Sequence, residues 1–409
     1  MKNLVKAAAV ASIAAGAALL AVEAGFAQIA NGAQTVEGRP SGQAASFAPV
    51  GPGLSRLPLT NPTVVPYQAT SGALPANVVG GSSGASGVSS FAYGNNNNFK
   101  WPYTIARVAV TGVPYATTNG ALVPVASRPY RYSGKLWMRF GTQWYVCTAS
   151  LVKKGVLVTA AHCIHNYGRG NAGFANEVRW FPANHAAGGP NGGGPFSYFV
   201  GQSWRVPASY VNGTDTCETG AIGVVCNNDI ATVRLAPRNG RYAGTILGGW
   251  YSYGWNGYSF VATPVFGNAT VAALTQIGYP VAIDGGQQML RGDSYGKYIQ
   301  LTGANRKVLK NIQLGSAMTG GSSGGPWLVN FGTTPAVTGG AVLGRVGTMA
   351  RNTVVGVTSW GYTTPGINVQ GASWFGVNAE FPAASYGTYG AGNIGKLMFD
   401  TCTAAPAYC

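Results

Sequence analysis

Three short segments of the chain contain residue types that could attack an acyl bond. The first contains a histidine, the second an aspartate and the third two adjacent serines, and they read VTAAHC at 158–163, NDIATVRL at 228–235 and GGSSGGP at 320–326. A serine hydroxyl is a weak nucleophile at neutral pH and needs an adjacent base. An imidazole, whose pKa is about 6.5, can take the proton and return it to a leaving amine. A buried carboxylate can fix the imidazole tautomer and stabilise the imidazolium. The order His162, Asp229, Ser323 therefore predicts nucleophilic catalysis.

Other residues compete for two of these roles. Three further aspartates lie between the histidine and the serine in sequence: Asp215, Asp284 and Asp293. Only Asp229 opens an apolar, strand-like run, so we expect it to be the orienting acid. The serine segment contains both Ser322 and Ser323, and the register Gly-x-Ser-Gly-Gly selects Ser323. The flanking glycines allow backbone N–H groups to turn inward toward an oxyanion, and loss of one such donor costs about 10²- to 10³-fold in rate.

The elements that must position these residues are short strands. Of 409 residues, 46% are hydrophobic, 11% aromatic and only 9% charged, and this apolar content with so few charges excludes a disordered chain. The 62 glycines indicate a chain rich in turns. Short β-type runs alternate with turn signals, at 135–140, 144–146, 155–159 and 353–358. This spacing predicts an all-β sandwich or barrel. Long helical periodicity is not evident, and the segment GGPNGGGP at 188–195 is a loop.

The amino-terminal part of the chain predicts export. Residues 1–27 have a positive start, a short apolar run and small residues before Ala27, the pattern of a cleaved signal peptide rather than of a membrane anchor. Residues 28–100 form a low-complexity leader or propeptide, which we call the leader, with a small folding-assisting pro-domain as the alternative. Residues 101–409 follow as one domain. The sequence thus predicts a secreted protein, extracellular or periplasmic, without a membrane anchor.

The basic charge of the chain does not indicate a polyanion site. The formal net charge is +16, and it is +15 once residues 1–27 and their Lys2, Lys6 and Glu23 are removed. Apart from the pairs Lys153–Lys154 and Arg306–Lys307, the basic residues are scattered singly, and no basic helix is evident. We therefore expect no specific nucleic-acid partner.

The six cysteines favour disulfides. An even number of cysteines in an exported chain is typical of a disulfide framework, although six cysteines allow 15 connectivities. They fall into three couples that are local in sequence, and we pair them so: Cys147 with Cys163, Cys217 with Cys226, and Cys402 with Cys409. The spacings are not those of a zinc module, and there are only three histidines. No metal is expected, and His165 and His185 are interpreted as surface or loop residues.

Four motifs together resemble the trypsin/chymotrypsin-like serine proteases, in their bacterial secreted branch. They match the family's histidine, aspartate and serine motifs and the strand that binds the substrate backbone, and they read TAAHC at 159–163, DIA at 229–231, GSSGGP at 321–326 and VTSWG at 357–361. The last contains Ser359, Trp360 and Gly361. The resemblance covers about residues 128–400.

The resemblance implies a fold and a set of roles. The expected fold has two antiparallel six-stranded β-barrels with the site between them, preceded by a flexible leader. His162 would be the general base and acid, Asp229 would orient it, and Ser323 would attack the peptide carbonyl. The N–H groups of Gly321 and Ser323 would form the oxyanion hole. Such an endopeptidase needs no cofactor, and its partners are protein or peptide substrates.

The same resemblance carries a prediction of specificity. The residue six positions before the nucleophile, at the floor of the family's primary pocket, is Ala317, and Met318 follows it. The absence of a carboxylate there disfavours Lys or Arg, and Thr358 stands where glutamate-specific relatives have histidine. Gly361 and Gly366 resemble the pocket-wall glycines. We therefore expect apolar or aromatic residues before the cut bond.

One residue departs from the pattern of the animal enzymes. These have aspartate just before the nucleophile, paired with the new amino terminus after zymogen cleavage, whereas this chain has Ser322. That ion pair cannot form. We expect the leader to be removed by another route, or the active-site loop to be ordered without a buried amine.

Two rival classes of protein fit the sequence less well than an endopeptidase. A non-catalytic binding or adhesion module on a protease fold normally lacks one of the three catalytic residues, and all three are present here. An esterase of the α/β-hydrolase type needs strand–helix alternation and the order Ser, Asp, His, and neither is found.

Overall fold

The computed structural model describes most of the chain from residue 125 onward and parts of the leader. The described residues are 34–41, 64–66, 70–71, 91–96, 99–108, 125–185, 189–192, 194–218, 221–264, 267–302, 306–335, 345–346, 351–362 and 368–409. The chain divides into two compact units, Met1–Gln34 and Thr35–Cys409, and all elements below belong to the second. The predicted signal peptide lies outside the described residues, and much of the leader does too. Within the described part, no helix has the length and apolar character needed to cross a membrane.

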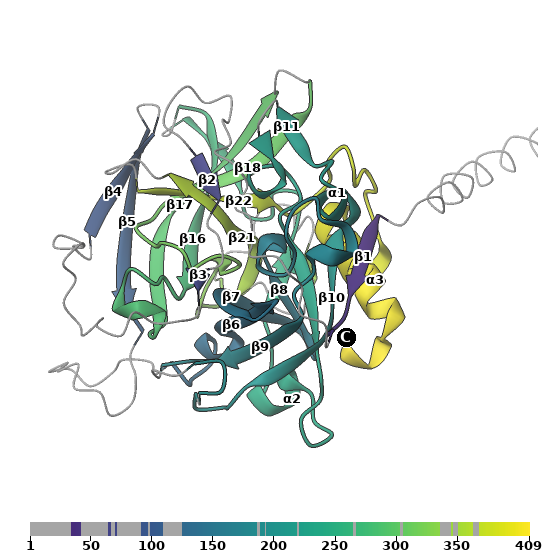
Figure 1. Cartoon of the computed structure of the whole chain (residues 1–409). Coiled ribbons are helices and arrows are strands. Elements are labelled where there is room, and N and C mark those ends of the chain that lie inside the picture. The colour runs from purple at the N-terminus through teal and green to yellow at the C-terminus, as the bar shows by residue number, and fades with distance from the viewer. Residues whose placement is uncertain are drawn as a thin grey trace, which may run out of the picture. The chain divides into compact units, whose positions relative to one another are not determined.

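The first barrel consists of six antiparallel strands (Figure 1). In spatial order they are β10 (Phe199–Pro207), β13 (Ala231–Leu235), β8 (Val156–Thr159), β7 (Gln143–Lys153), β6 (Ser133–Phe140) and β9 (Glu177–Pro182). Pairing of β9 with β10 closes the ring. Along β10, buried Phe199, Gly201 and Ser203 alternate with exposed neighbours, as expected for a strand with one face in the core.

The second barrel has the same construction. Its strands are, in spatial order, β16 (Ala269–Gly278), β19 (Pro326–Val329), β21 (Thr353–Tyr362), β22 (Val369–Trp374), β18 (Val308–Gly315) and β17 (Leu290–Thr302). Pairing of β16 with β17 closes it. Two closed six-stranded antiparallel barrels confirm the all-β fold class predicted from the sequence.

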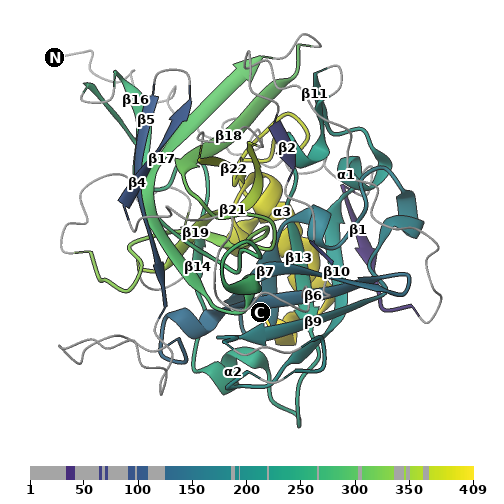
Figure 2. The same cartoon turned by 60° about the vertical axis from the view of Figure 1, so that its left-hand side comes forward.

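Further strands extend these sheets, and several come from the leader. Strand β1 (Thr35–Gly38) pairs with β10, β2 (Val64–Pro66) with β21, and β3 (Thr70–Ser71) with β7. The hairpin of β4 (Phe91–Asn96) and β5 (Phe99–Arg107) lies along β17 (Figure 2). The remaining strands are β11 (Thr216–Glu218), β12 (Ala221–Ile222), β14 (Ser252–Gly254), β15 (Val261–Thr263) and β20 (Arg345–Val346).

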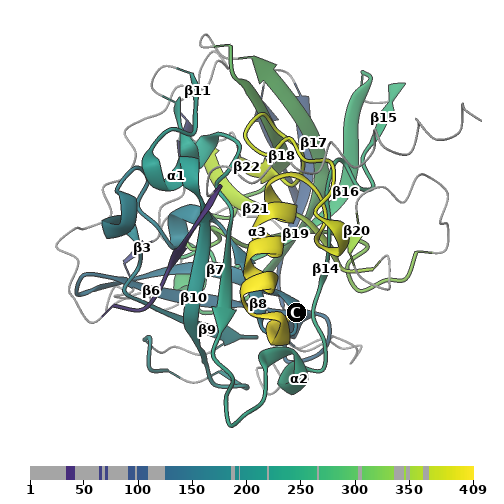
Figure 3. The same cartoon turned by 90° about the vertical axis from the view of Figure 1, so that its right-hand side faces the viewer.

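Helices are few among the described residues. The α-helices are α1 (Ala208–Asn212), α2 (Ala243–Leu247) and α3 (Gly392–Ala404), and the 3₁₀ turns are Tyr130–Tyr132, Ala161–Cys163, Gly170–Gly173, Gly223–Val225, Asp284–Gly286, Gly387–Tyr389 and Pro406–Tyr408. Helix α3 packs on β10 and β13 of the first barrel (Figure 3). It buries Ile394, Leu397, Met398 and Cys402, which share one helix face at spacings of three and four. The sequence shows no long helical periodicity, so α3 was not expected from it.

Candidate active site

Pairing of two strands brings the histidine and aspartate motifs together. Strand β8 ends at Thr159, which is paired with Ala231 at the start of β13. His162 follows β8 on the 3₁₀ turn Ala161–Cys163, and Asp229 lies two residues before β13. The two motifs, 67 residues apart in sequence, therefore stand at the same end of two neighbouring strands.

The Asp229 carboxylate is fully buried and holds the histidine at two atoms. Its Oδ1 accepts the His162 backbone N–H over 2.8 Å, and its Oδ2 lies 2.8 Å from His162 Nδ1. A carboxylate accepts, so Nδ1 carries the proton and Nε2 of the neutral ring is an acceptor. Nε2 has no hydrogen-bond partner among the described residues. The imidazole is thus fixed on one side and unsatisfied on the other.

Two serines of the second barrel complete the surroundings of Asp229. Ser359 of β21 donates from Oγ to Asp229 Oδ2 over 2.5 Å, and the Asp229 N–H donates to Oγ of Ser373 on β22 over 3.1 Å. Ser359 was predicted as part of the substrate strand. Ser373 was missed, because nothing in its local sequence connects it to a residue 144 positions away.

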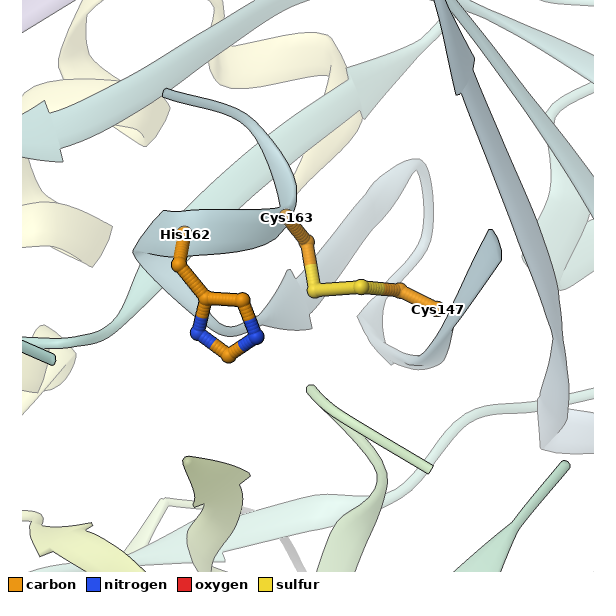
Figure 4. Close-up of side chains that lie close together, drawn as sticks. All are labelled: Cys147, His162 and Cys163. Carbon is orange, nitrogen blue, oxygen red and sulfur yellow. A yellow bond between two sulfur atoms is a disulfide. The ribbon is translucent and has the colours of Figure 1, made fainter. Parts of the chain in front are cut away.

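The disulfide predicted beside the histidine is present (Figure 4). Cys147 of β7 is joined to Cys163, so the turn that carries His162 is covalently tied to β7. A ring nitrogen of His162 and both sulfur atoms lie within 4.8 Å of one another. These sulfurs are bonded to each other, so they offer no thiolate to a metal ion. The pairs Cys217–Cys226 and Cys402–Cys409 are also confirmed.

Thr148, the residue after Cys147, connects this region to the serine turn. Its N–H donates to the Ser323 carbonyl over 2.7 Å, and its hydroxyl donates to the Gly321 carbonyl over 2.9 Å. Ser323 is fully buried. The backbone of the serine turn is therefore held against the strand whose disulfide packs beside the His162 ring. Thr148 lies within the CTASLV segment at 147–152, but its side-chain role has no signal in the sequence.

Glycine is required at two positions of the serine turn. Gly321 has φ +96°, and a Cβ there would lie 2.5 Å from the Tyr279 carbonyl oxygen. Gly324 has φ +75°, and a Cβ there would lie 2.0 Å from Thr159 Oγ1. Side chains are strained at such φ and excluded at such distances.

In the same turn, the peptide group between Gly320 and Gly321 is oriented by a hydrogen bond to Val281. The Gly320 carbonyl accepts the Val281 N–H over 2.8 Å. In a trans peptide the C=O and the following N–H point in opposite directions. The Gly321 N–H consequently points away from Val281.

Ser322 holds the turn from within. Its Oγ donates to the Thr319 carbonyl over 2.6 Å, and its N–H donates to the same oxygen over 3.1 Å. The turn is therefore hydrogen-bonded without an acidic side chain at this position.

The residues predicted for specificity occupy different surroundings. Met318 is buried with Tyr103, Ile105 and Leu290, and Ala317 packs against that cluster. Their part in substrate binding stays a prediction. Trp360 is buried and donates from Nε1 to Asn311 Oδ1 over 2.6 Å, and Gly361 is buried in β21. Gly366 lies outside the described residues.

A buried polar network under Met318 was not foreseen. Gln276 donates to Thr358 Oγ1 over 2.9 Å and to Gln370, and Gln370 donates to the Met318 carbonyl. Ser316 donates to Gln276 Oε1 over 2.7 Å and accepts the Met318 N–H over 3.1 Å. Every member of this network is neutral. Its members come from four separate strands and turns, so no local sequence pattern predicts the network.

The competing aspartates and histidines have other partners. Asp284 is paired with Arg107 and Asp293 with Arg291, while Asp215 accepts the Asn228 N–H. His165 is buried rather than on the surface, with Nε2 donating to the Gly170 carbonyl over 2.7 Å. Burial lowers the His165 pKa to about 4, so the ring is neutral.

The strand pairings and this arrangement define a class of protein. Two closed six-stranded barrels, with a His–Asp pair on the first and a glycine-rich serine turn on the second, make up the chymotrypsin-like fold that the motifs indicated. No protein-family model matches the chain, and no curated protein matches it.

Solved structures offer similar chains. This chain is similar to the thermostable serine protease AL20 from an extremophilic microorganism, at 21% identity over 60% of this chain and 92% of that one, with a TM-score of 0.43. It is also similar to the protease Anisep from Arthrobacter nicotinovorans, at 20% identity over 61% and 91%, with a TM-score of 0.42. A third similar structure is a Glu endopeptidase, at 17% identity over 62% and 89%, with a TM-score of 0.38.

Proposed function

We propose that the protein is a secreted serine endopeptidase that cleaves peptide bonds through an acyl-enzyme on Ser323. The observation that carries the proposal is the hydrogen bond of 2.8 Å between His162 Nδ1 and Asp229 Oδ2, with Nε2 left as an unsatisfied acceptor. A base fixed in this tautomer is what a serine nucleophile requires.

The proposed reaction begins with acylation of Ser323. Ser323 Oγ attacks the carbonyl carbon of the peptide bond, and His162 Nε2 takes the hydroxyl proton. Asp229 stabilises the imidazolium, which then donates the proton to the leaving amine. Water repeats the sequence on the ester and regenerates Ser323. A general base contributes about 10²- to 10⁴-fold to such a step.

The oxyanion of each tetrahedral intermediate is stabilised by backbone donors of the serine turn. The Gly321 N–H is directed away from Val281, and the turn is held by Thr148 and Ser322. These donors are fixed before substrate binds, so little reorganisation accompanies the developing charge.

The specificity of the proposed enzyme is for apolar or aromatic residues before the cut bond. The network of Gln276, Thr358, Gln370 and Ser316 under Met318 supports this, because it contains no charged group and its hydrogen bonds are used internally. A charged substrate side chain would find no counter-charge in this network. A peptide-library profile dominated by Arg, Lys or Glu would contradict the proposal.

Export of the enzyme is supported by its cysteines. All six form disulfides, which persist in oxidising compartments. Together with the signal-peptide pattern of residues 1–27, this supports a protein that acts outside the cytoplasm.

Active-site labelling tests the function without knowledge of the natural substrate. A fluorophosphonate probe should label the exported protein at one residue, and Ser323→Ala should abolish labelling. The matched control is Ser385→Ala, since Ser385 is an exposed serine outside the serine turn. Absence of label on the folded, leader-free protein would favour the rival class, a non-catalytic binding module.

A further inference from the structure

The first barrel includes one strand that the sequence assigned to the leader. Strand β1 runs antiparallel to β10, from Thr35 opposite Pro207 to Gly38 opposite Trp204. Pairing with β9 covers residues 199–200 of β10, so β1 continues along the edge of β10 that lies opposite β13. Strand edges accept an extended peptide through main-chain hydrogen bonds. Strand β1 is therefore an additional strand of this barrel.

Both ends of residues 35–41, which we call the β1 segment, are held by hydrogen bonds. Thr35 is buried and donates from Oγ1 to the Asp400 carboxylate of α3, which lies beside β1 (Figure 1). At the other end, the Ser41 N–H donates to the Asn176 carbonyl over 3.1 Å, and Asn176 Nδ2 donates to Ser41 Oγ over 2.7 Å. The β1 segment is thus attached to the first barrel and to the helix packed on it.

The apolar and small residues of the β1 segment match the surface of the barrel. Val36 packs against the hydrophobic core of the first barrel. Gly38 is buried, and a Cβ there would lie 2.3 Å from Trp204 Nε1 and 2.6 Å from Phe174 Cδ1. Glycine marks a place where neighbouring atoms approach the backbone closely. The edge of β10 therefore accepts glycine, and no larger residue, opposite Trp204.

The charge of the β1 segment also matches that of the edge. Glu37 lies opposite Arg205, with Oε2 2.6 Å from Arg205 Nη2 and Oε1 3.8 Å from Arg234 Nη2. The two arginine side chains are only 17% and 12% exposed. Within the part of the chain that the structure describes, no other acid pairs with either arginine. A buried charge that loses its partner is strongly unfavourable, so this edge requires an acidic strand.

We propose that the edge of β10 is a binding site for the acidic β1 segment, which stays on the protein as a separate peptide when the leader is cut between β1 and β2. The cut is hydrolysis of one peptide bond by water, and the segment keeps its hydrogen bonds and ion pairs to the barrel. The processed protein then consists of two chains. The inference does not rest on the proposed function, because it concerns the assembly of the first barrel and not Ser323.

The first test cuts the chain at a chosen place. A recognition site for a sequence-specific protease is inserted between Gly51 and Pro52, in the chain from Gln28 onward with Ser323→Ala. After the cut, the amino-terminal fragment should elute with the remainder in gel filtration and give one complex in native mass spectrometry. In urea the two should separate. Release of the fragment under native conditions overturns the proposal.

The second test measures the specificity of the edge with synthetic peptides, so that the folding of the protein is not at stake. A fluorescent peptide of residues 33–43, added in excess, should replace the fragment on the cut protein, as followed by anisotropy. Peptides with Glu37→Gln or Gly38→Ala should bind at least about 10-fold more weakly, because the first leaves two buried arginines unpaired and the second overlaps Trp204.

The peptide with Arg39→Gln is the matched control. Arg39 also contacts Glu37, over 3.3 Å, but its side chain is 71% exposed. Exposed ion pairs contribute little, so its affinity should lie within about 2-fold of the parent peptide. Equal affinity of the Glu37→Gln and parent peptides, or no binding of the parent peptide at millimolar concentration, overturns the proposed binding site.

The uncut protein shows whether β1 comes from the same chain. Protection of the amides of residues 204–206 from hydrogen exchange should be independent of protein concentration. Protection that is lost on dilution assigns β1 to a second copy and overturns the intramolecular arrangement. All these measurements use Ser323→Ala, so their outcome is separate from that of fluorophosphonate labelling, and failure of either proposal leaves the other standing.

Discussion

Ser359 of the second barrel holds Asp229 of the first. The Ser359 hydroxyl donates to Asp229 Oδ2 over 2.5 Å, and the same oxygen lies 2.8 Å from His162 Nδ1. Ser373 of β22 accepts the Asp229 N–H over 3.1 Å. The orientation of the histidine, which stands on the first barrel, consequently depends on strands of the second. Separation of the barrels by a small distance would disturb the His–Asp pair.

Ser359→Ala should lower kcat/KM about 10-fold. The substitution leaves Asp229 buried with one donor fewer, and loss of a hydrogen bond to a buried charged group costs about 1–3 kcal/mol. Part of that cost should appear as reduced stability in denaturant and part as a less well oriented imidazole. Peptide hydrolysis and urea unfolding measure the two. Rates and stability equal to those of the parent would refute the coupling.

Gly324→Ala should unfold the serine turn or prevent folding. A Cβ at this φ would lie 2.0 Å from Thr159 Oγ1 and 2.4 Å from the Thr148 carbonyl oxygen, so the first barrel would have to move. We expect a loss of at least about 3 kcal/mol, from left-handed strain and steric overlap together.

Gly240→Ala is the matched control for that substitution. Gly240 has φ +72°, close to that of Gly324, but an added Cβ would meet nothing within 4 Å. Its cost should be the conformational strain alone, about 1 kcal/mol. Urea unfolding of both variants checks the difference, and equal losses would show that the turn can relax away from β7 and β8.

The sequence predicted the strands and the covalent framework because their signals are local. The runs at 135–140, 155–159 and 353–358 coincide with β6, β8 and β21. Each disulfide joins two cysteines that follow one another in the order of cysteines along the chain. The histidine and aspartate motifs lie side by side because β8 and β13 are paired. Local sequence patterns therefore predicted much of the first barrel.

What the sequence did not reveal depends on contacts between distant segments. Gln276 and Gln370 meet across 94 residues in the second barrel, and polar residues inside strands carry no local sign of a shared network. Helix α3 was overlooked for a different reason. Its apolar face is regular, but Gly392 and Gly395 near its start are poor helix formers, so tertiary packing on the first barrel outweighs propensity.

Lys135→Met should stabilise the protein at neutral pH. Lys135 is 2% exposed, its Nζ donates to the Gly286 carbonyl over 2.9 Å, and burial lowers its pKa to about 8 from 10.5. The unfolded chain thus binds more protons than the folded one between about pH 8 and 10.5, so stability rises with pH across that window. Below it, burial of the charge is unfavourable. Removing the charge should gain about 1–3 kcal/mol at pH 7 after loss of one hydrogen bond.

Urea unfolding at pH 7 and pH 10 measures the effect of Lys135→Met. The gain should be largest at pH 7 and smaller at pH 10, where the parent is relieved of the charge. Lys310→Met is the comparison, since Lys310 Nζ also donates to a backbone carbonyl, that of Val377, over 2.9 Å, but the residue is only half-buried. It should lose rather than gain stability. A Lys135→Met protein less stable than its parent at pH 7 would contradict the argument.

Two acids, buried Asp215 and half-buried Glu380, lie beside the aspartate motif. Asp215 Oδ2 accepts the Asn228 N–H over 3.0 Å, and Glu380 Oε2 accepts from the Asn228 side chain over 2.7 Å. Burial, followed by the nearby Glu380 charge, raises the Asp215 pKa from 3.8 to about 8. Burial also raises the Glu380 pKa. Asn228 directly precedes Asp229, so this pair supports the loop that delivers the proposed orienting acid.

The pH dependence of stability should therefore run opposite to that of an ion-paired carboxylate. Between about pH 4 and 8 the folded protein keeps a proton on Asp215 that the unfolded chain releases, so stability falls as pH rises through this window, with a limiting slope of about 1.4 kcal/mol per pH unit. Asp215→Asn keeps the shape of the side chain and should flatten that slope. Glu380→Gln removes the neighbouring charge, which lowers the folded-state pKa of Asp215, so the loss of stability should end at a lower pH. Urea unfolding at pH 5, 6.5 and 8 measures all three proteins; stability of the parent that rises steadily from pH 5 to 8 would mean that Asp215 is ionised in the folded state.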